Sequence, residues 1–299
     1  MRRDGLAMLR VLIRLLAALA LLSPLAARAQ QTLTVGSRWF TTSDGVRLHY
    51  FEAGSATAHT IVLVPGWRMP GWIFGPQLQD LSGTYHVVAF DPRGQGDSEV
   101  AATGYEPVRR GQDIAELLAV LGGGPVVIGG WSLGVLDTLA YAHQYGNASI
   151  AGLVLVDNSV GEDPAPRPSH RGYPPHDYGP LASDVRMRRF VEGMFLRPQS
   201  EYYLQLLTDA TLHTPEFASR ELLRYPVPRT YWRDALYATQ RPVLYVVRPR
   251  FQAQAENVAR HDPLVEAVVI SDAGHALFID DAPQFNTLLR DFITRRIWH

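Results

Sequence analysis

The stretch Gly130-Trp131-Ser132-Leu133-Gly134 decides the fold. The run before it, Pro125–Gly129 (PVVIG), is short, apolar and rich in β-branched residues, which predicts a buried strand. The residues after it, Val135–Tyr145, carry apolar side chains at helical spacing and stop at Gly146, which predicts a helix. A serine between two glycines on a strand–turn–helix is the setting of a nucleophile elbow. The sequence therefore predicts that Ser132 is a catalytic nucleophile on a sharp turn.

The two glycines of this stretch have a physical purpose. They leave room for the turn and let the strand and the helix approach each other without a Cβ clash. The N-terminus of the helix offers free N–H groups and positive potential where an oxyanion would develop. The alternative, a turn of small residues without chemistry, does not explain the flanking strand and helix.

The composition indicates one enzyme-sized α/β domain. The chain has 299 residues, of which 46% are hydrophobic and 19% charged, enough for a large core and an insertion. Five arginines but only one acidic residue lie within residues 1–29, so the rest of the chain is acidic, and no basic patch points to nucleic acid. There is no cysteine, which excludes disulfides and a lipid-modified cysteine.

The N-terminus has the pattern of a secretory signal. Arg2, Arg3, Arg10 and Arg14 form a basic region, and Leu15–Leu22 is a short apolar run. Ala27-Arg28-Ala29 matches the small-x-small cleavage pattern. We expect residues 1–29 to be removed, leaving a periplasmic or secreted protein that starts at Gln30 and has no stable membrane anchor. A retained anchor is the alternative, although the apolar run is short for a bilayer.

Apolar runs typical of strands alternate with helical patterns, which predicts a mostly parallel sheet covered by helices on both faces. A hairpin is expected at Ser37–Thr42 and Val46–Glu52, followed by strands at Thr60–Val64, Tyr85–Phe90, Ala151–Val156, Pro242–Val247 and Leu264–Ile270. Helical spacing appears at Gly71–Leu81, Pro107–Leu121 and Ala282–Trp298.

The alternation breaks in the middle of the chain. Residues 161–180 hold six prolines and cannot form a regular element, and short aromatic-rich helices are expected from Ser183 to about Ala238. We therefore divide the mature chain into a first core part (30–158), a cap insertion (159–236) and a second core part (237–299).

A serine hydroxyl needs a base to remove its proton, and the base needs an acid to hold its tautomer. His275, in a Gly-His turn after a late apolar strand, is the strongest candidate for the base. His170, His176 and Asp177 lack the spacing of a metal site, so no metal and no cofactor are expected.

The acid is harder to assign, because Arg248-Pro249-Arg250-Phe251 follows the Pro242–Val247 strand, where an acid often sits. Asp157, at the carboxyl end of the strand after the elbow helix, occupies the other suitable position. It could instead only cap a turn. The remaining candidates are Glu256, Asp262, Asp272 and Asp280.

Backbone N–H groups are expected to form the oxyanion hole. One belongs to Leu133, directly after the nucleophile, and the other to Trp67, after the Thr60–Val64 strand. The indoles of Trp67 and Trp131 could wall a substrate pocket, or both could pack in the core.

Four motifs in this order resemble the α/β-hydrolase superfamily: PGW (65–67), DPRGQGDS (91–98), GWSLG (130–134) and DAGH (272–275). The resemblance covers residues 36–158 and 237–298, and it implies an eight-stranded, mostly parallel sheet with a helical cap over the active site. The chain departs from the commonest pattern at Pro65, where a histidine is usual, and in the missing acid after the late strand. It also resembles haloalkane dehalogenases in the position of Asp157, but their nucleophile is an aspartate, which argues against dehalogenase and epoxide-hydrolase chemistry here.

These features together predict an exported serine hydrolase that cleaves ester-like bonds of small molecules through an acyl-enzyme. The same triad would serve a cofactor-free peroxidase or perhydrolase, or an aminopeptidase. A binding protein on a hydrolase scaffold is the alternative from another class. The sequence leaves the substrate and the oligomeric state open.

Overall fold

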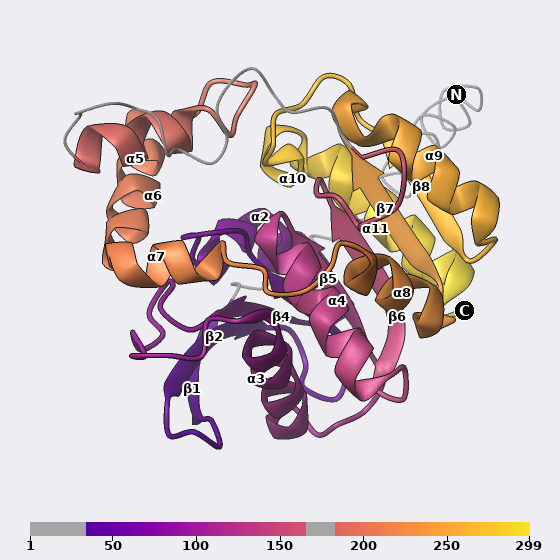
Figure 1. Ribbon diagram of the computed structural model, residues 1–299, viewed down its shortest axis with the longest axis horizontal. Helices are drawn as coiled ribbons and strands as arrows, with labels where there is room; N and C mark the ends of the chain where they lie inside the picture. Colours follow the sequence, from indigo (N-terminus) through magenta and orange to yellow (C-terminus); the bar gives the residue numbers. More distant parts are fainter. Residues whose placement is uncertain (1–33, 166–182) are drawn as a thin grey trace, which may run out of the picture. The chain divides into compact units, whose positions relative to one another are not determined.

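The computed structural model describes residues 34–165 and 183–299. Its eight strands form one sheet in the spatial order β1-β2-β4-β3-β5-β6-β7-β8 (Figure 1). The two pairs that involve β2 are antiparallel and the other pairs are parallel. The predicted mostly parallel, eight-stranded sheet is therefore confirmed. The strands are β1 (Gly36–Thr41), β2 (Arg47–Ala53), β3 (Thr60–Val64), β4 (His86–Asp91), β5 (Val126–Trp131), β6 (Ile150–Val156), β7 (Val243–Val247) and β8 (Val265–Val269).

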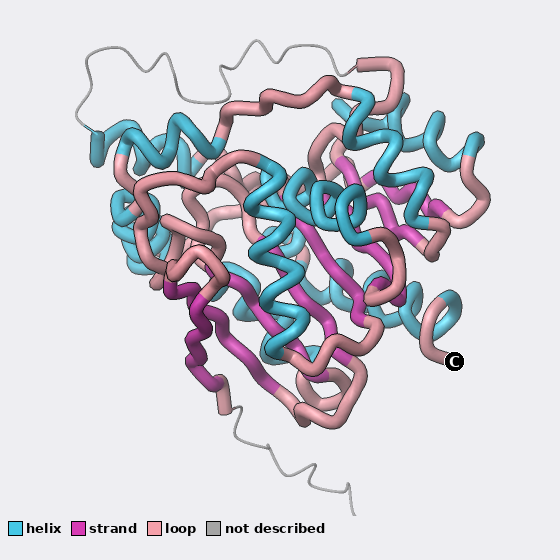
Figure 2. Tube along the Cα trace, turned by 60° about the horizontal axis from the view of Figure 1, so that its bottom comes forward, coloured by secondary structure: helices cyan, strands magenta, loops and turns pink. Residues whose placement is uncertain are grey.

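Helices flank the sheet on both faces (Figure 2). Helix α4 packs between α3 and α8, and α2 packs against α11. The helices are η1 (Gly71–Phe74), α2 (Gly75–Leu81), α3 (Pro107–Val120), α4 (Leu133–Tyr145), α5 (Ser183–Glu192), α6 (Glu201–His213), α7 (Glu216–Leu222), α8 (Thr230–Thr239), η2 (Pro249–Phe251), α9 (Gln252–His261), α10 (Leu277–Asp280) and α11 (Ala282–Arg296).

The inner strands are mostly apolar because helices cover both of their faces. Every residue of β4, β5 and β7 is buried, whereas most of β8, at one edge of the sheet, is only half-buried. Buried parallel strands read as continuous apolar runs, which is why these segments could be found from the sequence.

The single helix expected at Gly71–Leu81 is two elements. A 3₁₀ turn, η1, is followed by α2, which carries Pro76 in its first turn. Proline has no N–H to donate and is tolerated only in the first turn of a helix, so a new helix starts there.

The insertion differs from the core in its packing. Helices α5 and α6 pack against each other, whereas α8 packs on α4 of the core. The cap boundary expected at residue 236 falls inside α8, because a helical pattern does not reveal which layer the helix joins. The proposed signal, residues 1–29, and most of the proline-rich stretch lie outside the described residues. Within the described part, no helix combines the length and apolar character needed to cross a membrane.

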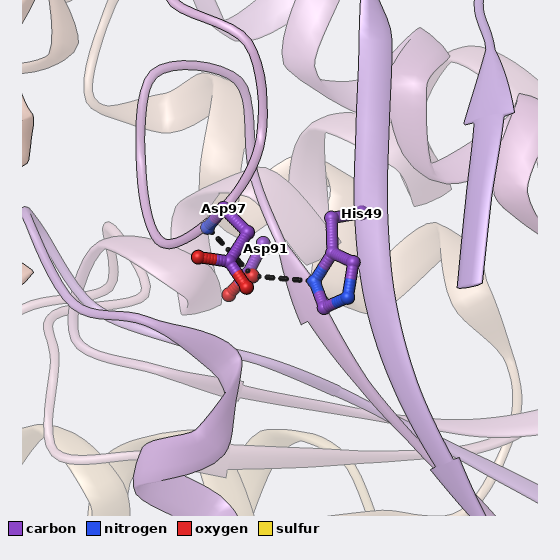
Figure 3. A group of neighbouring side chains, drawn as sticks. All are labelled: His49, Asp91 and Asp97. Carbon is purple, nitrogen blue, oxygen red and sulfur yellow. Dashed lines mark hydrogen bonds and ion pairs between the residues drawn. The ribbon is translucent and has the colours of Figure 1, made fainter. Parts of the chain in front are cut away.

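The loop after β4 is held by a buried carboxylate. Asp91 accepts a hydrogen bond from His49 Nδ1 at 2.7 Å and another from the backbone N–H of Asp97 at 2.9 Å (Figure 3). These three residues are spaced closely enough for a metal ion. The other ring nitrogen of His49 contacts Ser37 Oγ at 2.7 Å, and Asp91 also accepts the N–H of Gly71. The protein's own hydrogen bonds therefore account for the contacts of His49 and Asp91, which hold the loop beside β2.

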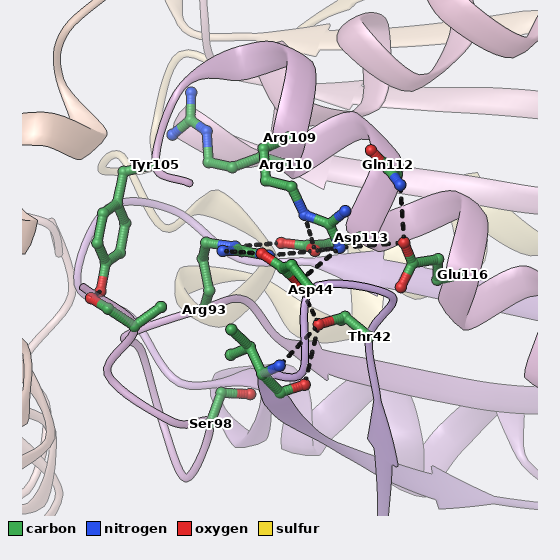
Figure 4. A network of polar contacts seen from close by, with 12 residues as sticks. Thr42, Asp44, Arg93, Ser98, Tyr105, Arg109, Arg110, Gln112, Asp113 and Glu116 are labelled. Carbon is green, nitrogen blue, oxygen red and sulfur yellow. Dashed lines mark hydrogen bonds and ion pairs between the residues drawn. The ribbon is translucent and has the colours of Figure 1, made fainter. Parts of the chain in front are cut away.

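A second buried network fastens the β1–β2 hairpin to α3. Arg93, fully buried, binds Asp113 through two hydrogen bonds of 2.6 and 2.7 Å and lies 3.2 Å from Asp44 (Figure 4). Arg109 joins the same carboxylates. Burial raises the pKa of the Asp113 carboxyl, and the two guanidinium groups oppose that shift. Removing one partner of such a buried pair typically costs about 3–5 kcal/mol because it leaves an uncompensated buried charge, so the loop that carries Arg93 depends on all members of the network.

Candidate active site

The candidate site lies where the sheet's strand order reverses. From β3 the chain continues to β4 on one side and then to β5 on the other side of β3. Open α/β sheets bind ligands in the crevice outside the carboxyl ends of such strands. Trp67 follows β3 and Ser132 follows β5, so both of these predicted site residues lie at this switch point.

Ser132 occupies a strained turn between β5 and α4. Its backbone has φ 54° and ψ −118°, a conformation that residues with a Cβ rarely adopt. A Cβ on Gly130 would lie 2.3 Å from the carbonyl oxygen of Gly134, and a Cβ on Gly134 would lie 2.2 Å from that of Val64. Both glycines are therefore required for β5, α4 and β3 to approach each other. This geometry is that of a nucleophile elbow.

The three residues predicted as a triad lie in one line of hydrogen bonds. Ser132 Oγ is 2.9 Å from Nε2 of His275, and Nδ1 of His275 is 2.6 Å from Oδ2 of Asp157. Both distances are within hydrogen-bond reach, and the second meets the limit of about 3.2 Å expected for an orienting acid. The side chain of Asp157 is fully buried and that of His275 is 9% exposed. The arrangement supports proton transfer from Ser132 to His275.

The other candidate acids lie elsewhere. Glu256 accepts a hydrogen bond from Gln252 on the exposed side of α9, and Asp262 caps the N–H of Leu264. Asp272 pairs weakly with Arg197 on the surface. Asp280 supports the site indirectly. It accepts a hydrogen bond from the N–H of Gly274 at 2.6 Å and so holds the loop that carries His275.

Arg248 is the group near the site that the sequence did not predict. Its Nε donates to Oδ2 of Asp157 at 2.6 Å, its backbone N–H donates to Oδ1 at 2.9 Å, and its Nη2 lies 3.3 Å from Nδ1 of His275. The guanidinium therefore shares with His275 one oxygen of the acid. Arg248 stands directly after β7, where an acid often sits. The arginine at this position was the signal in the sequence that could have pointed to its role.

The electrostatics favour a neutral imidazole facing an ionised acid. Burial lowers the pKa of the His275 imidazole; the hydrogen bond and charge of Asp157 oppose this, and the charges of Arg248 and Arg250 add to it. Burial raises the pKa of the Asp157 carboxyl, but His275 and Arg248 outweigh burial, so this pKa lies below its usual value. A neutral His275 can accept the proton of Ser132.

Backbone amides can form the oxyanion hole. Leu133 is the first residue of α4, so its N–H has no acceptor within the helix. Trp67 lies in a turn closed by the hydrogen bond from Met69 N to Gly66 O, at 3.1 Å. A Cβ on Gly66 would lie 3.0 Å from Cβ of Ser132, so this turn rests directly against the nucleophile. The amides predicted as donors thus belong to segments that meet at Ser132.

The two tryptophans expected near the site differ in role. Trp131 is 1% exposed, and its indole N–H donates to the carbonyl of His275 at 2.8 Å, so it supports the His275 loop from the core. Trp67 is 8% exposed and reaches toward the cap, where its indole N–H donates to the carbonyl of Ser219 at 2.9 Å. A large indole suits both settings, so the sequence alone could not separate them.

Comparison with known proteins identifies the family. Residues 61–287 match the model of the alpha/beta hydrolase family, which is most of the chain. The chain belongs to this family, and it is a hydrolase enzyme with esterase-like relatives.

Two curated relatives differ in how far they match. A pimeloyl-[acyl-carrier protein] methyl ester esterase from Xanthomonas oryzae pv. oryzae is 27% identical over 247 residues, which cover 78% of this chain and 94% of that protein. A soluble epoxide hydrolase from Corynebacterium sp. (strain C12) is 32% identical over 107 residues, or 36% of each chain. The chain thus spans only about a third of the epoxide hydrolase.

Solved structures share the fold. The esterase RhEst1 from Rhodococcus sp. ECU1013 superposes with a TM-score of 0.72 at 22% identity, covering 86% of this chain and 98% of that one. A bromoperoxidase from Bacillus anthracis superposes with a TM-score of 0.69 at 21% identity, covering 87% and 100%. At these identities the likeness concerns the fold alone.

Proposed function

We propose that the protein is an exported serine hydrolase that cleaves carboxylic ester-like bonds of small molecules through an acyl-enzyme. The observation that carries the proposal is the unbroken contact from Ser132 through His275 to Asp157, at 2.9 and 2.6 Å. Esterases among the relatives and solved structures support the bond type.

Each residue has a role in the proposed reaction. Ser132 Oγ attacks the ester carbonyl while Nε2 of His275 takes its proton, and the N–H groups of Trp67 and Leu133 stabilise the oxyanion. The imidazolium then gives the proton to the departing alcohol, which leaves the acyl group on Ser132. In the second half, His275 deprotonates a water that attacks the acyl carbon, and the imidazolium then gives that proton to Ser132 Oγ as its bond to the acyl group breaks, which releases the acid and restores the serine. Asp157 holds the tautomer and stabilises the imidazolium.

A fluorophosphonate probe tests the proposal directly. The activated Ser132 Oγ displaces fluoride from phosphorus, so mass spectrometry is expected to find the adduct on the peptide that contains Ser132. Ser132→Ala is expected to lose the adduct and to lower kcat by a factor on the order of 10⁴ or more with folding intact. Ser55→Ala, in an exposed loop, is the control and is expected to behave as the wild type. A protein that binds but does not react would label no faster than its denatured form, and that result would contradict the proposal.

A panel of substrates distinguishes ester hydrolysis from the other two reactions that the same triad would serve, perhydrolysis and amide cleavage. The bromoperoxidase among the solved structures favours perhydrolysis as the second candidate, in which peroxide replaces water in attack on the acyl-enzyme. We expect p-nitrophenyl esters to be cleaved without peroxide and faster than aminoacyl amides. Activity that depends on peroxide would favour the perhydrolase, and preferential amide cleavage would favour an aminopeptidase.

Export is the remaining part of the proposal and has its own measurement. The basic region, the apolar run and Ala27-Arg28-Ala29 predict cleavage after Ala29. N-terminal sequencing of protein from the periplasm or medium is expected to begin at Gln30. Intact Met1 in a membrane fraction would show a retained anchor instead.

A further inference from the structure

Arg68, next to the oxyanion turn, is a buried cation with few partners. Its backbone has φ 61°, in the left-handed region that favours glycine, and its N–H donates to Oε1 of Gln95 at 2.6 Å. The side chain is 6% exposed and runs from the core into the cap. A residue with a Cβ in this conformation costs about 1–3 kcal/mol, so the strain is tolerated only where neighbouring structure holds the residue.

The Arg68 guanidinium lies over the Trp67 ring, 5.2 Å from its centroid, but its remaining contacts leave its charge poorly balanced. Nη2 donates to the carbonyl of Thr214 at 2.7 Å, and Nη1 contacts Sδ of Met187, a weak acceptor, at 2.8 Å. The carboxylate of Glu216 is 3.6 Å away and 60% exposed, so water screens it. Within residues 34–165 and 183–299, Nε of Arg68 is buried without a hydrogen-bond partner. Buried charge normally has a partner, so this site is suited to an anion.

The guanidinium borders a small cavity between the oxyanion turn and cap helices α5 and α7. The cavity has a volume of about 30 Å³, and its walls include Trp67, three arginines (Arg68, Arg186 and Arg220) and one acid, Glu216. That volume admits about two waters or a group of similar size. Three cations against one carboxylate give the cavity a positive potential.

The cavity adjoins the proposed catalytic centre. Trp67, one of its walls, carries a backbone N–H proposed for the oxyanion hole, and the preceding Gly66 rests against Ser132. Arg68 is the next residue, about 3.8 Å along the chain from Cα to Cα. The cavity and the proposed catalytic centre therefore share Trp67, and a substrate that reacts at Ser132 has to extend past this residue to place a group in the cavity.

We propose that this cavity binds a carboxylate at the far end of the substrate, so that the enzyme prefers half-esters of dicarboxylic acids to neutral esters. The inference rests on the proposed esterase function and adds the substrate's charge to it. Guanidinium groups match the planar carboxylate through two parallel hydrogen bonds. The competing interpretation is that Arg68 only ties the cap to the oxyanion turn, in which case added anions would change nothing.

Binding to Ser132→Ala, which holds the substrate without turning it over, tests the cavity independently of catalysis. The probes are monoethyl adipate and its neutral isostere ethyl 5-carbamoylpentanoate, measured by calorimetry. We expect the anionic probe to bind at least about tenfold more tightly, as suits a charge-assisted hydrogen bond. Monoesters of succinate, glutarate and suberate then show which chain length spans the distance.

Two substitutions in the cavity wall are expected to act in opposite directions. Added to Ser132→Ala, Arg186→Gln removes a positive charge and is expected to weaken binding of monoethyl adipate about fivefold. Glu216→Gln removes the competing carboxylate and is expected to strengthen it by about threefold to fivefold, the size of a partly exposed charge effect. Neither is expected to change binding of the amide. Arg224→Gln, on an arginine that is 74% exposed and not a wall of the cavity, is the matched control.

The outcomes separate this inference from the function on which it rests. Equal binding of the anionic and neutral probes, or the same direction of change in both wall variants, would overturn the carboxylate site even if Ser132 labels with fluorophosphonate. Failure of Ser132 to label while the anionic probe binds selectively would overturn the esterase and leave the site as an anion-binding cavity. Arg68→Met, checked for its thermal unfolding, is expected to abolish the preference for the anion if the variant folds.

Discussion

Replacing Arg248 with glutamine is expected to move the acid limb of the kcat/KM–pH profile upward by about one pH unit. Burial lowers the pKa of the His275 imidazole most, and the Arg248 charge, 3.3 Å from Nδ1, lowers it further. Arg248 also shares Oδ2 of Asp157 with His275. Its removal frees that oxygen for the imidazolium, so both effects raise the pKa of His275.

The size of the shift follows from distance and exposure. Two unit charges 3.3 Å apart interact by about 1.3 kcal/mol in water and by about 5 kcal/mol at an effective dielectric constant of 20. The Arg248 side chain is 26% exposed and its charge is largely offset by the Asp157 carboxylate 2.6 Å away, so the smaller value is the better guide. About 1.4 kcal/mol corresponds to one pKa unit. His275 must be neutral to act as base. At pH values below the acid limb, kcat/KM of the variant is therefore expected to be about tenfold lower than that of the wild type, and at pH values above the limb the two are expected to be similar.

The assay is hydrolysis of a p-nitrophenyl ester between about pH 4 and 9. The backbone N–H of residue 248 still donates to Asp157 in the variant, so the carboxylate keeps one anchor. Arg248→Lys keeps the positive charge and is expected to show only part of the shift. Arg260→Gln, on the exposed side of α9, is expected to show no shift. An unmoved limb with a uniform loss of kcat would refute the electrostatic argument and leave Arg248 as a mechanical support for Asp157.

Two further substitutions test the elbow and the acid. Asp157→Asn is expected to keep the fold but lower kcat by roughly 10³–10⁴, because an amide fixes the wrong tautomer of His275; circular dichroism and ester hydrolysis check this, and wild-type turnover would exclude Asp157 as the acid. Gly134→Ala places a Cβ 2.2 Å from the carbonyl of Val64, so thermal unfolding is expected to show a loss of about 1–3 kcal/mol or more. Gly124→Ala, where a Cβ meets nothing within 4 Å, is the control, and equal stability of the two variants would contradict the packing argument.

The parts of the fold that depend on local pattern could be predicted from the sequence. The strand at Thr60–Val64 has the predicted bounds because it is a continuous apolar run between polar turns. The elbow could be predicted because backbone contacts demand glycine at two fixed positions. Features that depend on tertiary contacts could not be predicted in this way. The pairing of Arg248 with Asp157, the core position of Trp131 and the membership of α8 in the core all require knowing which segments lie side by side.

The location of the acid shows how local pattern and tertiary contacts combine. Strands β6 and β7 are parallel neighbours in register, with Val156 opposite Val246, and the ladder continues past the strand end, where Asp157 N donates to the carbonyl of Val246 at 2.9 Å. Neighbouring strands are about 4.8 Å apart, so a carboxylate after either one lies within reach of the same imidazole. An acid can therefore occupy the end of β6 once the end of β7 carries another residue. In this chain that residue, Arg248, turns back to the carboxylate, so the exchange of positions also alters the charge that His275 meets.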